Sequence, residues 1–343
     1  MAGASATLDI IVIVEGSAKS VVVSFDPNPQ MREAIESAIG DLARITYVEG
    51  LDDARRAAAL SRADALLDWG NRLRPQDLAL LGSVELVQVL SAGVEHFPLD
   101  LLPEGVALAA NGGGWAEPMA EHVLAMTLAL AKRLPRNHEL LAEGIFDQAT
   151  RTVELRGALV AVLGYGGIGR ASAKLFRAFG ARILAVTRSP TDDELVERAA
   201  SLDELDEILA AADVLVISIP LTRVTRGLIG GRQLSLMKPD AILINVARAA
   251  IVDEDALYEH LLATPSFCAG LDVWWQEPRH GGRFTTRRPF FELANVIGSP
   301  HNSAMTERSS GEAARHAAEN VARALRGEAA QHLVDRSEYS EPR

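Results

Sequence analysis

Residues 159–189 read LVAVLGYGGIGRASAKLFRAFGARILAVTRS. An apolar strand at Leu159–Leu163 is predicted to lead into a glycine-rich turn, then a helix, then a second strand at 183–186. The turn, from Gly164 to Gly169, has the G-x-G-x-x-G spacing of a dinucleotide-binding unit. Because the motif lies between a strand and a helix, a cofactor site is a stronger interpretation than a glycine-rich turn of another kind.

Each glycine of the turn has a physical role. Gly164 allows a tight turn after the strand, Gly166 has no side chain to keep the backbone from a pyrophosphate, and Gly169 lets helix and strand pack closely. The helix N-terminus then directs N–H groups at the phosphates. The predicted cofactor contacts in this turn are Gly164, Tyr165, Gly166, Gly167, Ile168 and Gly169.

The end of the second strand predicts which nicotinamide cofactor binds. NAD-selective units place Asp or Glu there to bind the ribose hydroxyls, but this chain has Thr187, followed by Arg188 and Ser189. An arginine pairs with a 2′-phosphate, which an acid would repel. We therefore predict NADP(H) as the preferred cofactor and NAD(H) as a second one. The alternatives are that Arg188 stacks on the adenine or lies in solvent, and that Asp192 or Asp193 reaches the ribose.

Composition bounds the class of protein. A chain of 343 residues suggests two domains, and a net charge of −12 argues against nucleic acid and anionic membranes as partners. The single cysteine, Cys268, cannot form an internal disulfide, which suits a reducing compartment. The N-terminus has no signal-peptide pattern, and no apolar run is long enough to cross a membrane. We expect a cytoplasmic protein that binds a small-molecule substrate and has no metal site.

Alternating apolar strands and helices predict an α/β fold with parallel sheets covered on both faces. The segment at 111–114 marks a boundary, Pro135 stops or kinks a long helix, and the residues from Val334 on are expected to form a frayed polar tail. A helix beginning near Ser201 has a capping box with Glu204. The expected strands are 8–14, 43–48, 65–67, 86–90, 159–163, 183–186, 214–219, 241–245, 267–272 and 296–297, and the expected helices are 31–39, 54–60, 117–134, 201–209, 253–262 and 306–325.

Three charged residues are predicted at carboxyl ends of successive strands, where parallel sheets bind ligands. Arg248 follows the strand at 241–245, Glu277 follows that at 267–272, and His301 follows that at 296–297. The arginine can hold a carboxylate, the histidine can protonate a carbonyl oxygen as hydride reaches its carbon, and the glutamate can hold the imidazole in one tautomer. Each residue alone also has a structural interpretation, as a helix cap, a surface acid or a loop histidine. Together they suit hydride transfer to a carbonyl group.

Further sequence blocks follow in order from Ser91 to His301. Besides the glycine turn, they are SAGV at 91–94, AEH at 120–122, PLT at 220–222, TRGLI at 225–229, NVAR at 245–248, IVD at 251–253, GLDV at 270–273, EP at 277–278 and PH at 300–301. With these blocks the chain resembles the D-isomer-specific 2-hydroxyacid dehydrogenase family, which includes phosphoglycerate dehydrogenases and glyoxylate/hydroxypyruvate reductases.

The resemblance implies two Rossmann-like doubly wound domains with an active-site cleft between them. Residues 1–115 plus 306–343 would form a flavodoxin-like substrate-binding domain, and residues 116–305 the dinucleotide-binding domain. The helix at 117–134 would help to form a homodimer. The implied catalytic residues are Arg248, Glu277 and His301; the implied substrate contacts are Ala92, Gly93, Val94, Arg248 and His301; and the implied further cofactor contacts are Pro220, Thr225, Val246, Ala247, Arg248, Asp272 and His301.

The chain departs from the family pattern in three places. Ala249 replaces the glycine that usually follows the arginine, so the backbone there must avoid positive φ or bear strain. Trp274 and Trp275 stand where one aromatic residue is usual. The loop at 279–288 carries four arginines, which could help to bind an anionic substrate, although a solvated loop is the favoured interpretation.

We expect an NADPH-preferring 2-oxoacid reductase that works in the D-series, with glyoxylate and hydroxypyruvate as the default substrates on resemblance alone. One alternative is a cofactor-sensing binding protein with little turnover. The other is a hydride-transfer enzyme for a different donor, such as phosphite. Formate enzymes of this fold carry glutamine at the position of Glu277, which argues against formate as the donor.

Overall fold

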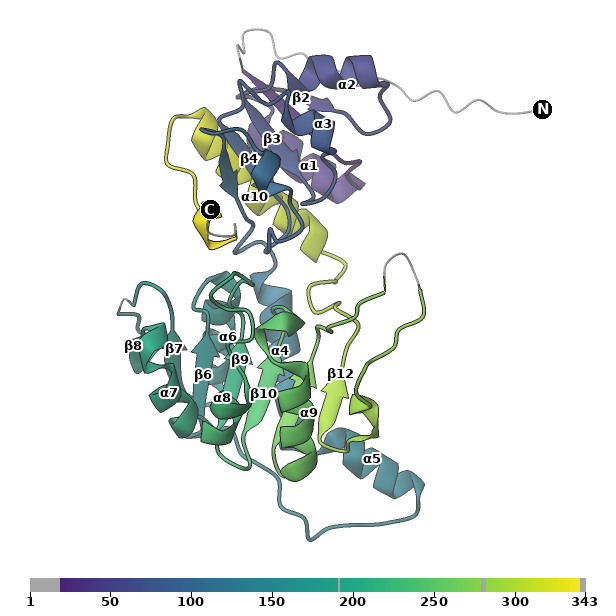
Figure 1. Ribbon diagram of the computed structural model, residues 1–343, viewed down its shortest axis with the longest axis vertical. Coiled ribbons are helices and arrows are strands. Elements are labelled where there is room, and N and C mark those ends of the chain that lie inside the picture. The colour runs from purple at the N-terminus through teal and green to yellow at the C-terminus, as the bar shows by residue number, and fades with distance from the viewer. Residues whose placement is uncertain (1–18, 191, 279–281, 340–343) are drawn as a thin grey trace, which may run out of the picture. The chain divides into compact units, whose positions relative to one another are not determined.

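The computed structural model describes residues 19–190, 192–278 and 282–339, and the fold is given for these residues. They form two compact units: the chain up to Gly114 together with the chain from Arg308 onward, and Trp115–Glu307. Each unit is built on one parallel β-sheet (Figure 1). The strand predicted at 8–14 lies outside the described residues.

The first unit has a five-stranded sheet in the order β2-β1-β3-β4-β5, and every neighbouring pair is parallel. This is the flavodoxin-like order of doubly wound folds. The predicted elements are present with small changes of their ends, but β1, β5 and α3 were not predicted. The strands are β1 (Ser20–Val23), β2 (Arg44–Tyr47), β3 (Ala65–Asp68), β4 (Leu86–Val89) and β5 (Ala107–Ala109), and the helices are α1 (Pro29–Ile39), α2 (Asp53–Leu60), α3 (Pro75–Leu78) and α10 (Ser309–Leu325).

Helices α1 and α10 cover one face of this sheet. The buried face of α10 carries Ala314, Ala317 and Ala318, whose small side chains let the helix lie close to α1 and the strands. Asn28 caps α1 by accepting a hydrogen bond from the Met31 N–H at 2.9 Å. The last long helix of the chain therefore completes the unit that contains the first strands.

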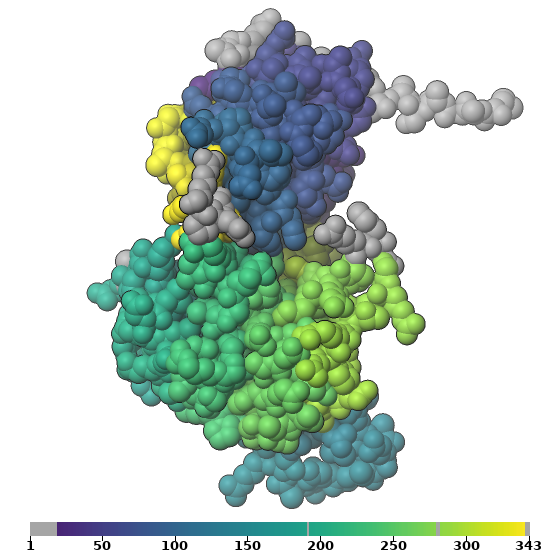
Figure 2. All heavy atoms as spheres, viewed as in Figure 1, coloured from purple at the N-terminus to yellow at the C-terminus, as the bar shows by residue number. Residues whose placement is uncertain are grey.

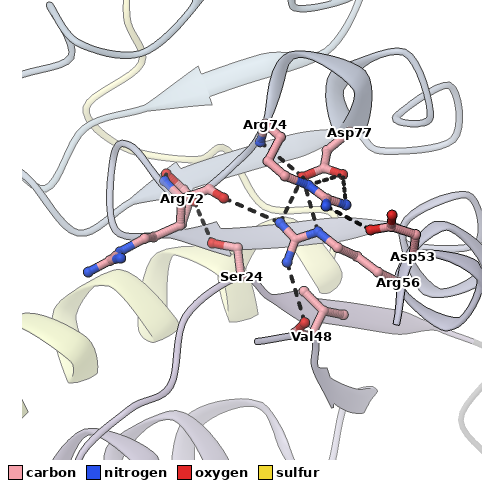
Figure 3. Close-up of polar contacts among 8 residues, drawn as sticks. Ser24, Val48, Asp53, Arg56, Arg72, Arg74 and Asp77 are labelled. Carbon is pink, nitrogen blue, oxygen red and sulfur yellow. Dashed lines mark hydrogen bonds and ion pairs between the residues drawn. The ribbon is translucent and has the colours of Figure 1, made fainter. Parts of the chain in front are cut away.

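A buried ion-pair network ties α2 and α3 together on the other side of this unit (Figure 3). The Arg56 guanidinium lies 2.7 Å from Asp77, and both side chains are almost fully buried. Arg74 also pairs with Asp77, at 3.1 Å, and with Asp53, at 2.7 Å. A buried pair of this kind is costly to break, because the remaining charge would be left without a partner.

Residues 334–339 do not form the frayed tail that we predicted from Val334 onward. The Val334 N–H donates to the Leu108 carbonyl at 2.8 Å, and the Tyr339 ring packs against the core of the first unit. Arg336 donates hydrogen bonds to the carbonyl oxygens of Leu102, Pro103 and Val106. The polar composition of this segment misled the prediction, because its contacts are made with residues more than two hundred positions away.

The second unit has a seven-stranded parallel sheet in the order β12-β11-β10-β9-β6-β7-β8. Its order is that of the dinucleotide-binding Rossmann fold with one further strand, and it reverses between β6 and β9. Strand β8 and helices α5 and α8 were not predicted. The strands are β6 (Leu159–Leu163), β7 (Arg182–Val186), β8 (Arg198–Ala200), β9 (Val214–Ile217), β10 (Ile242–Asn245), β11 (Cys268–Leu271) and β12 (Val296–Gly298), and the helices are α4 (Ala116–Ala131), α5 (Leu134–Ala142), α6 (Gly167–Ala178), α7 (Leu205–Ala211), α8 (Gly231–Leu236) and α9 (Glu254–Ala263).

Helices α7, α8 and α9 cover one face of this sheet (Figure 1), and α4 and α6 cover the other. Ala116 and Ala120 of α4 pack against Ala171 of α6, so these two helices approach closely. The capping box predicted at Ser201 and Glu204 is present, although a short 3-10 turn separates it from α7. Both faces of the strands are therefore buried, as expected for a parallel sheet.

The long helix predicted at 117–134 is present as α4, which ends three residues earlier, and a further helix that was not predicted, α5, follows it. Helix α4 ends at Ala131, and Arg133 adopts a left-handed conformation with φ of +52° before α5 begins. Pro135 lies in the first turn of α5, where its missing N–H needs no partner, so it begins a helix rather than ending one.

Candidate active site

The glycine turn joins β6 to α6 at the point where the strand order reverses. Gly164 has φ of +100°, and a Cβ there would lie 2.6 Å from the Ile219 backbone nitrogen. A Cβ on Gly169 would collide with the Gly164 carbonyl oxygen, whereas the same position on Gly166 is open. The turn therefore combines tight strand–helix packing with the accessible backbone that a pyrophosphate requires.

The remaining predicted cofactor residues lie in loops at carboxyl ends of the same sheet. Thr187 follows β7, and the next two residues, Arg188 and Ser189, are exposed. In the loop after β9, the Thr225 hydroxyl donates to the Pro220 carbonyl at 2.7 Å and accepts from the Thr222 N–H at 2.8 Å. Thr225 therefore shapes this loop.

One of the two acids that follow the end of β7, Asp193, is engaged by the protein itself. The Asp193 carboxylate pairs with Arg170 at 2.8 Å and accepts from the Leu195 N–H at 2.9 Å. The hydrogen bond from Leu195 and the pairing with Arg170 lower the pKa of Asp193, so it is held in charged form by groups of the protein itself. Arg188 remains the charged residue next to the strand end.

The structure brings together His301 and Glu277 from two neighbouring strand ends. Glu277 lies in the loop after β11 and His301 in the loop after β12, and these strands pair directly. The His301 Nδ1 atom lies 2.8 Å and 3.0 Å from the two carboxylate oxygens of Glu277. A carboxylate at this distance keeps the proton on Nδ1 and leaves Nε2 as the nitrogen that can exchange a proton.

The surroundings of Glu277 hold it ionised. Burial disfavours the carboxylate, but hydrogen bonds from the His301 ring and the Trp274 N–H, with the charges of His301 and Arg248, outweigh burial and lower the pKa of Glu277. An ionised carboxylate beside the ring stabilises the imidazolium form of the histidine. The pair thus has the charge arrangement of a general acid and its supporting base.

Arg248 follows β10, the third strand of this edge of the sheet. Its Nη1 atom donates to the Ala247 carbonyl at 2.7 Å, and its positive charge acts on Glu277. Val246 and Ala247, both predicted cofactor contacts, are buried just before it. Ala249 begins a short 3-10 turn and is not among the residues with positive φ, so the replacement of the usual glycine imposes no left-handed strain.

Asp272 organises the loop that carries His301. Its carboxylate is fully buried; one oxygen accepts from the Ser299 hydroxyl at 2.5 Å and the Asn302 N–H at 3.1 Å, and the other accepts from the Ser303 N–H at 3.2 Å. Burial raises the pKa of Asp272, but these hydrogen bonds outweigh it and the net shift is downward. The carboxylate therefore stays charged inside the protein.

Our sequence reasoning missed His122 as part of this network. Its Nε2 atom lies 2.9 Å from the Ser299 hydroxyl, which in turn donates to Asp272. His122 belongs to α4, more than 150 residues before Ser299 in sequence. The only sequence signal was its place in the AEH block, which carries no indication of this partner.

Other predicted residues are not brought to this site by the described contacts. Ala92, Gly93 and Val94 belong to the first compact unit, so their contact with substrate stays a prediction. Of the arginines in the loop at 279–288, Arg287 and Arg288 pair with acids in the first turn of α9, at 3.0 Å or less. These two arginines anchor their loop to α9, and most of the described residues of this loop are exposed, as expected.

In the part of the chain that the structure describes, His, Cys, Asp and Glu side chains form no cluster of three or more that could hold a metal ion. Among the helices of the same residues, none combines the length and the hydropathy needed to cross a membrane.

Comparisons with known proteins agree with this geometry. Residues 124–303 match the family model described as D-isomer specific 2-hydroxyacid dehydrogenase, NAD binding domain. A D-3-phosphoglycerate dehydrogenase of Mycobacterium tuberculosis is 32% identical over 295 residues, which are 85% of this chain and 55% of that protein. The chain thus spans about half the length of that relative.

Two further relatives match over most of their length. A glyoxylate/hydroxypyruvate reductase B of Pectobacterium carotovorum is 33% identical over 283 residues, which are 81% of this chain and 87% of that protein. A D-isomer specific 2-hydroxyacid dehydrogenase of Xanthobacter autotrophicus, solved with NADPH and MES, has a TM-score of 0.76 and 26% identity, and the match covers 94% of this chain and 99% of that one. The chain belongs to the D-isomer specific 2-hydroxyacid dehydrogenase family.

Proposed function

We propose that this protein is an NADP(H)-preferring reductase that converts a 2-oxo acid to a D-2-hydroxy acid. Family membership supports an oxidoreductase. The match to a glyoxylate/hydroxypyruvate reductase over 87% of its length, against 55% for a phosphoglycerate dehydrogenase, favours glyoxylate and hydroxypyruvate as first substrates to test.

The observation that carries the proposal is the hydrogen-bonded pair of His301 and Glu277, 2.8 Å apart. In this role the protonated ring donates its Nε2 proton to the substrate carbonyl oxygen, and the Glu277 carboxylate stabilises the positive ring before transfer. The glutamate also sets the tautomer, because its oxygens accept from the Nδ1–H.

Arg248 is proposed to hold the substrate carboxylate. Its guanidinium can donate two parallel hydrogen bonds to a carboxylate, which fixes the orientation of the adjacent carbonyl carbon. The bound cofactor supplies the hydride for this carbon. The role of Arg248 is thus in binding and orientation, whereas that of His301 is in proton transfer.

The preference for NADP(H) rests on the end of β7. Thr187 stands at the position that carries an acid in NAD-selective units, Arg188 follows it, and Asp193 is engaged by Arg170. An arginine at the end of β7, without an acid at position 187, favours a cofactor with a 2′-phosphate. The Xanthobacter relative, solved with NADPH, gives this choice indirect support.

The test is oxidation of NADPH, followed at 340 nm, with glyoxylate, hydroxypyruvate, pyruvate, 2-oxoisocaproate and phenylpyruvate, repeated with NADH. We expect turnover with at least one short 2-oxo acid and a higher kcat/KM for NADPH than for NADH. Binding of NADPH without turnover of any acid would contradict the reductase and support a cofactor-sensing protein. Reduction of NADP⁺ by phosphite alone would support the other alternative.

We also propose that the protein is a homodimer. Helix α5 has no buried residue in the single chain, and large apolar side chains on it and just after it are exposed: Leu134, Leu141 and Phe146 are 58%, 56% and 73% accessible. This segment projects from the rest of its unit (Figure 2). A surface of this kind is typical of an interface between subunits. Light scattering of the wild type and of Leu141→Asp/Phe146→Asp tests it, and a monomeric wild type would contradict it.

A further inference from the structure

Trp274 contacts both loops that carry the proposed catalytic pair. Its backbone N–H donates to the Glu277 carboxylate at 3.0 Å, and its indole Nε1–H donates to the Ser299 carbonyl at 2.9 Å. Ser299 lies two residues before His301. The side chain of Trp274 is buried, at 6% exposure, so these hydrogen bonds are made away from bulk water. One residue thus connects the loop after β11 to the loop after β12.

The His301 backbone needs such support. Its φ of +53° lies in the left-handed region, which is uncommon for residues other than glycine. Conformations of this kind persist only when the surrounding structure holds them in place. The His301 N–H donates to the Asp272 carbonyl at 2.8 Å, and Ser299 is held by Asp272 through its hydroxyl and by Trp274 through its carbonyl.

The packing around the indole shows that its position is closely defined. A Cβ on Gly298 would lie 2.5 Å from the Cζ2 atom of the Trp274 ring, so only glycine at the end of β12 leaves room for it. Phe284 and Phe291 also contact the indole, with ring centroids 5.2 Å and 5.0 Å away. The indole is therefore packed directly against the strand end that leads to His301.

We propose that Trp274 is a positioning residue that holds the His301 ring in register with Glu277. The indole N–H restrains the segment 299–301, while the backbone N–H of the same residue restrains the glutamate. A phenylalanine at this position would fill much of the same space but could not donate to Ser299. The inference rests on the roles proposed above for His301 and Glu277.

The adjacent Trp275 offers a matched control. Its indole N–H donates to the Val252 carbonyl, also at 2.9 Å, and its ring stacks on Phe290 at 5.5 Å. Trp275→Phe therefore removes an indole hydrogen bond of the same length from the next residue of the same loop, but one that goes to Val252 and not to the loop of His301. Comparing Trp274→Phe with Trp275→Phe separates positioning of the pair from a general loss of stability.

The experiment measures kcat, the KM for NADPH and the pH dependence of kcat, together with Tm. For Trp274→Phe we expect kcat to fall about five- to tenfold, the loss that follows when a buried carbonyl is left without its donor. The falling limb of the pH profile of kcat should move to lower pH. The reason is that a Glu277 carboxylate held less closely to His301 stabilises the protonated ring less well. The KM for NADPH should stay unchanged. Trp275→Phe should lower Tm about as much as Trp274→Phe does. Its kcat and its pH profile should stay close to those of the wild type.

Gly298→Ala provides a second test, because the added methyl group would lie 2.5 Å from the Trp274 ring and 3.2 Å from Phe291. It should displace the indole and lower kcat, and in the Trp274→Phe background it should lower kcat less, because the smaller ring leaves room. If Trp274→Phe does not fold, Gly298→Ala alone decides. Equal kcat losses in the two tryptophan variants, or an unshifted pH limb in Trp274→Phe and Gly298→Ala, would overturn the inference. A wild type without 2-oxoacid reduction would instead overturn the proposed function.

Discussion

Glu277→Gln tests the proposed chemistry most directly, because it removes a charge while keeping the shape of the side chain. The amide oxygen of glutamine can still accept from the His301 Nδ1–H, so the tautomer of the ring is retained. The change isolates the electrostatic support that the carboxylate gives to the protonated ring.

The size of the effect follows from the geometry of the pair. A hydrogen bond between charged groups contributes about 1.5–3 kcal/mol. Because 38% of the Glu277 side chain and 39% of the His301 side chain are exposed, solvent screening reduces this contribution to about 1 kcal/mol. That energy corresponds to a fall in kcat of about fivefold.

The same energy predicts the direction of the pH dependence. Reduction requires the protonated ring, so the rate falls as pH rises and the ring loses its proton. Without the carboxylate, the falling limb of the kcat profile should move toward acid, because the neutral amide stabilises a positive ring less well. In the wild type, the lowered pKa of Glu277 keeps the carboxylate charged down to pH values below the usual range of glutamate.

The assay is initial-rate NADPH oxidation across pH 5–10 with the best substrate of the panel. Glu197→Gln is the control, since Glu197 forms an exposed ion pair with Arg182, at 2.6 Å, where β7 begins, and it should leave kcat and the profile unchanged. A Glu277→Gln enzyme with wild-type kcat and an unshifted limb would refute the reasoning.

Three further predictions concern single residues. Arg248→Lys keeps the charge but loses the two-pronged fork, so the KM for the 2-oxo acid should rise about tenfold or more while kcat changes less; an unchanged KM would remove its carboxylate-binding role. Arg188→Ala should raise the KM for NADPH about tenfold and leave that for NADH nearly constant, and parallel changes in both would argue against a 2′-phosphate contact. Asp77→Asn leaves the buried Arg56 without its charged partner, and should lower the free energy of unfolding by about 3–5 kcal/mol. Burial acts to raise the pKa of Asp77, but hydrogen bonds from Arg56 and Arg74 lower it to about 2. This stabilisation is therefore present above the ordinary aspartate pKa and lost as pH falls toward 2, which urea unfolding from pH 2 to 6 measures; equal midpoints for wild type and variant at pH 6 would contradict it.

The cofactor turn could be read from sequence because its requirements are local. Gly164 needs a positive φ and Gly169 must leave room for a carbonyl five residues earlier in the chain, so glycine spacing alone carries the information. The strands beside the turn are also continuous apolar runs, and this pattern can be recognised without knowing which strands pair with them. The predicted strand ends at Arg248, Glu277 and His301 follow from the same local pattern.

Several elements escaped prediction because distant contacts stabilise them. Strand β1 is short and pairs with β2 and β3 to complete its sheet. The segment after Val334 is polar, yet it is held by hydrogen bonds to residues 102–108. Secondary structure formed through such tertiary contacts leaves little trace in local propensity.

Residue types and their spacing thus determined that this chain would form parallel sheets, a glycine turn for a dinucleotide, and polar groups at strand ends. Only the tertiary structure decided that β10, β11 and β12 lie side by side, which brings the His301 ring to within hydrogen-bond distance of Glu277. It also decided that Trp274, Ser299, Asp272 and His122 form one network around that pair. The physical reason is that strand order and side-chain contacts depend on the packing of segments far apart in the chain. Turn geometry and the spacing of apolar residues depend instead on residues that are neighbours in the sequence.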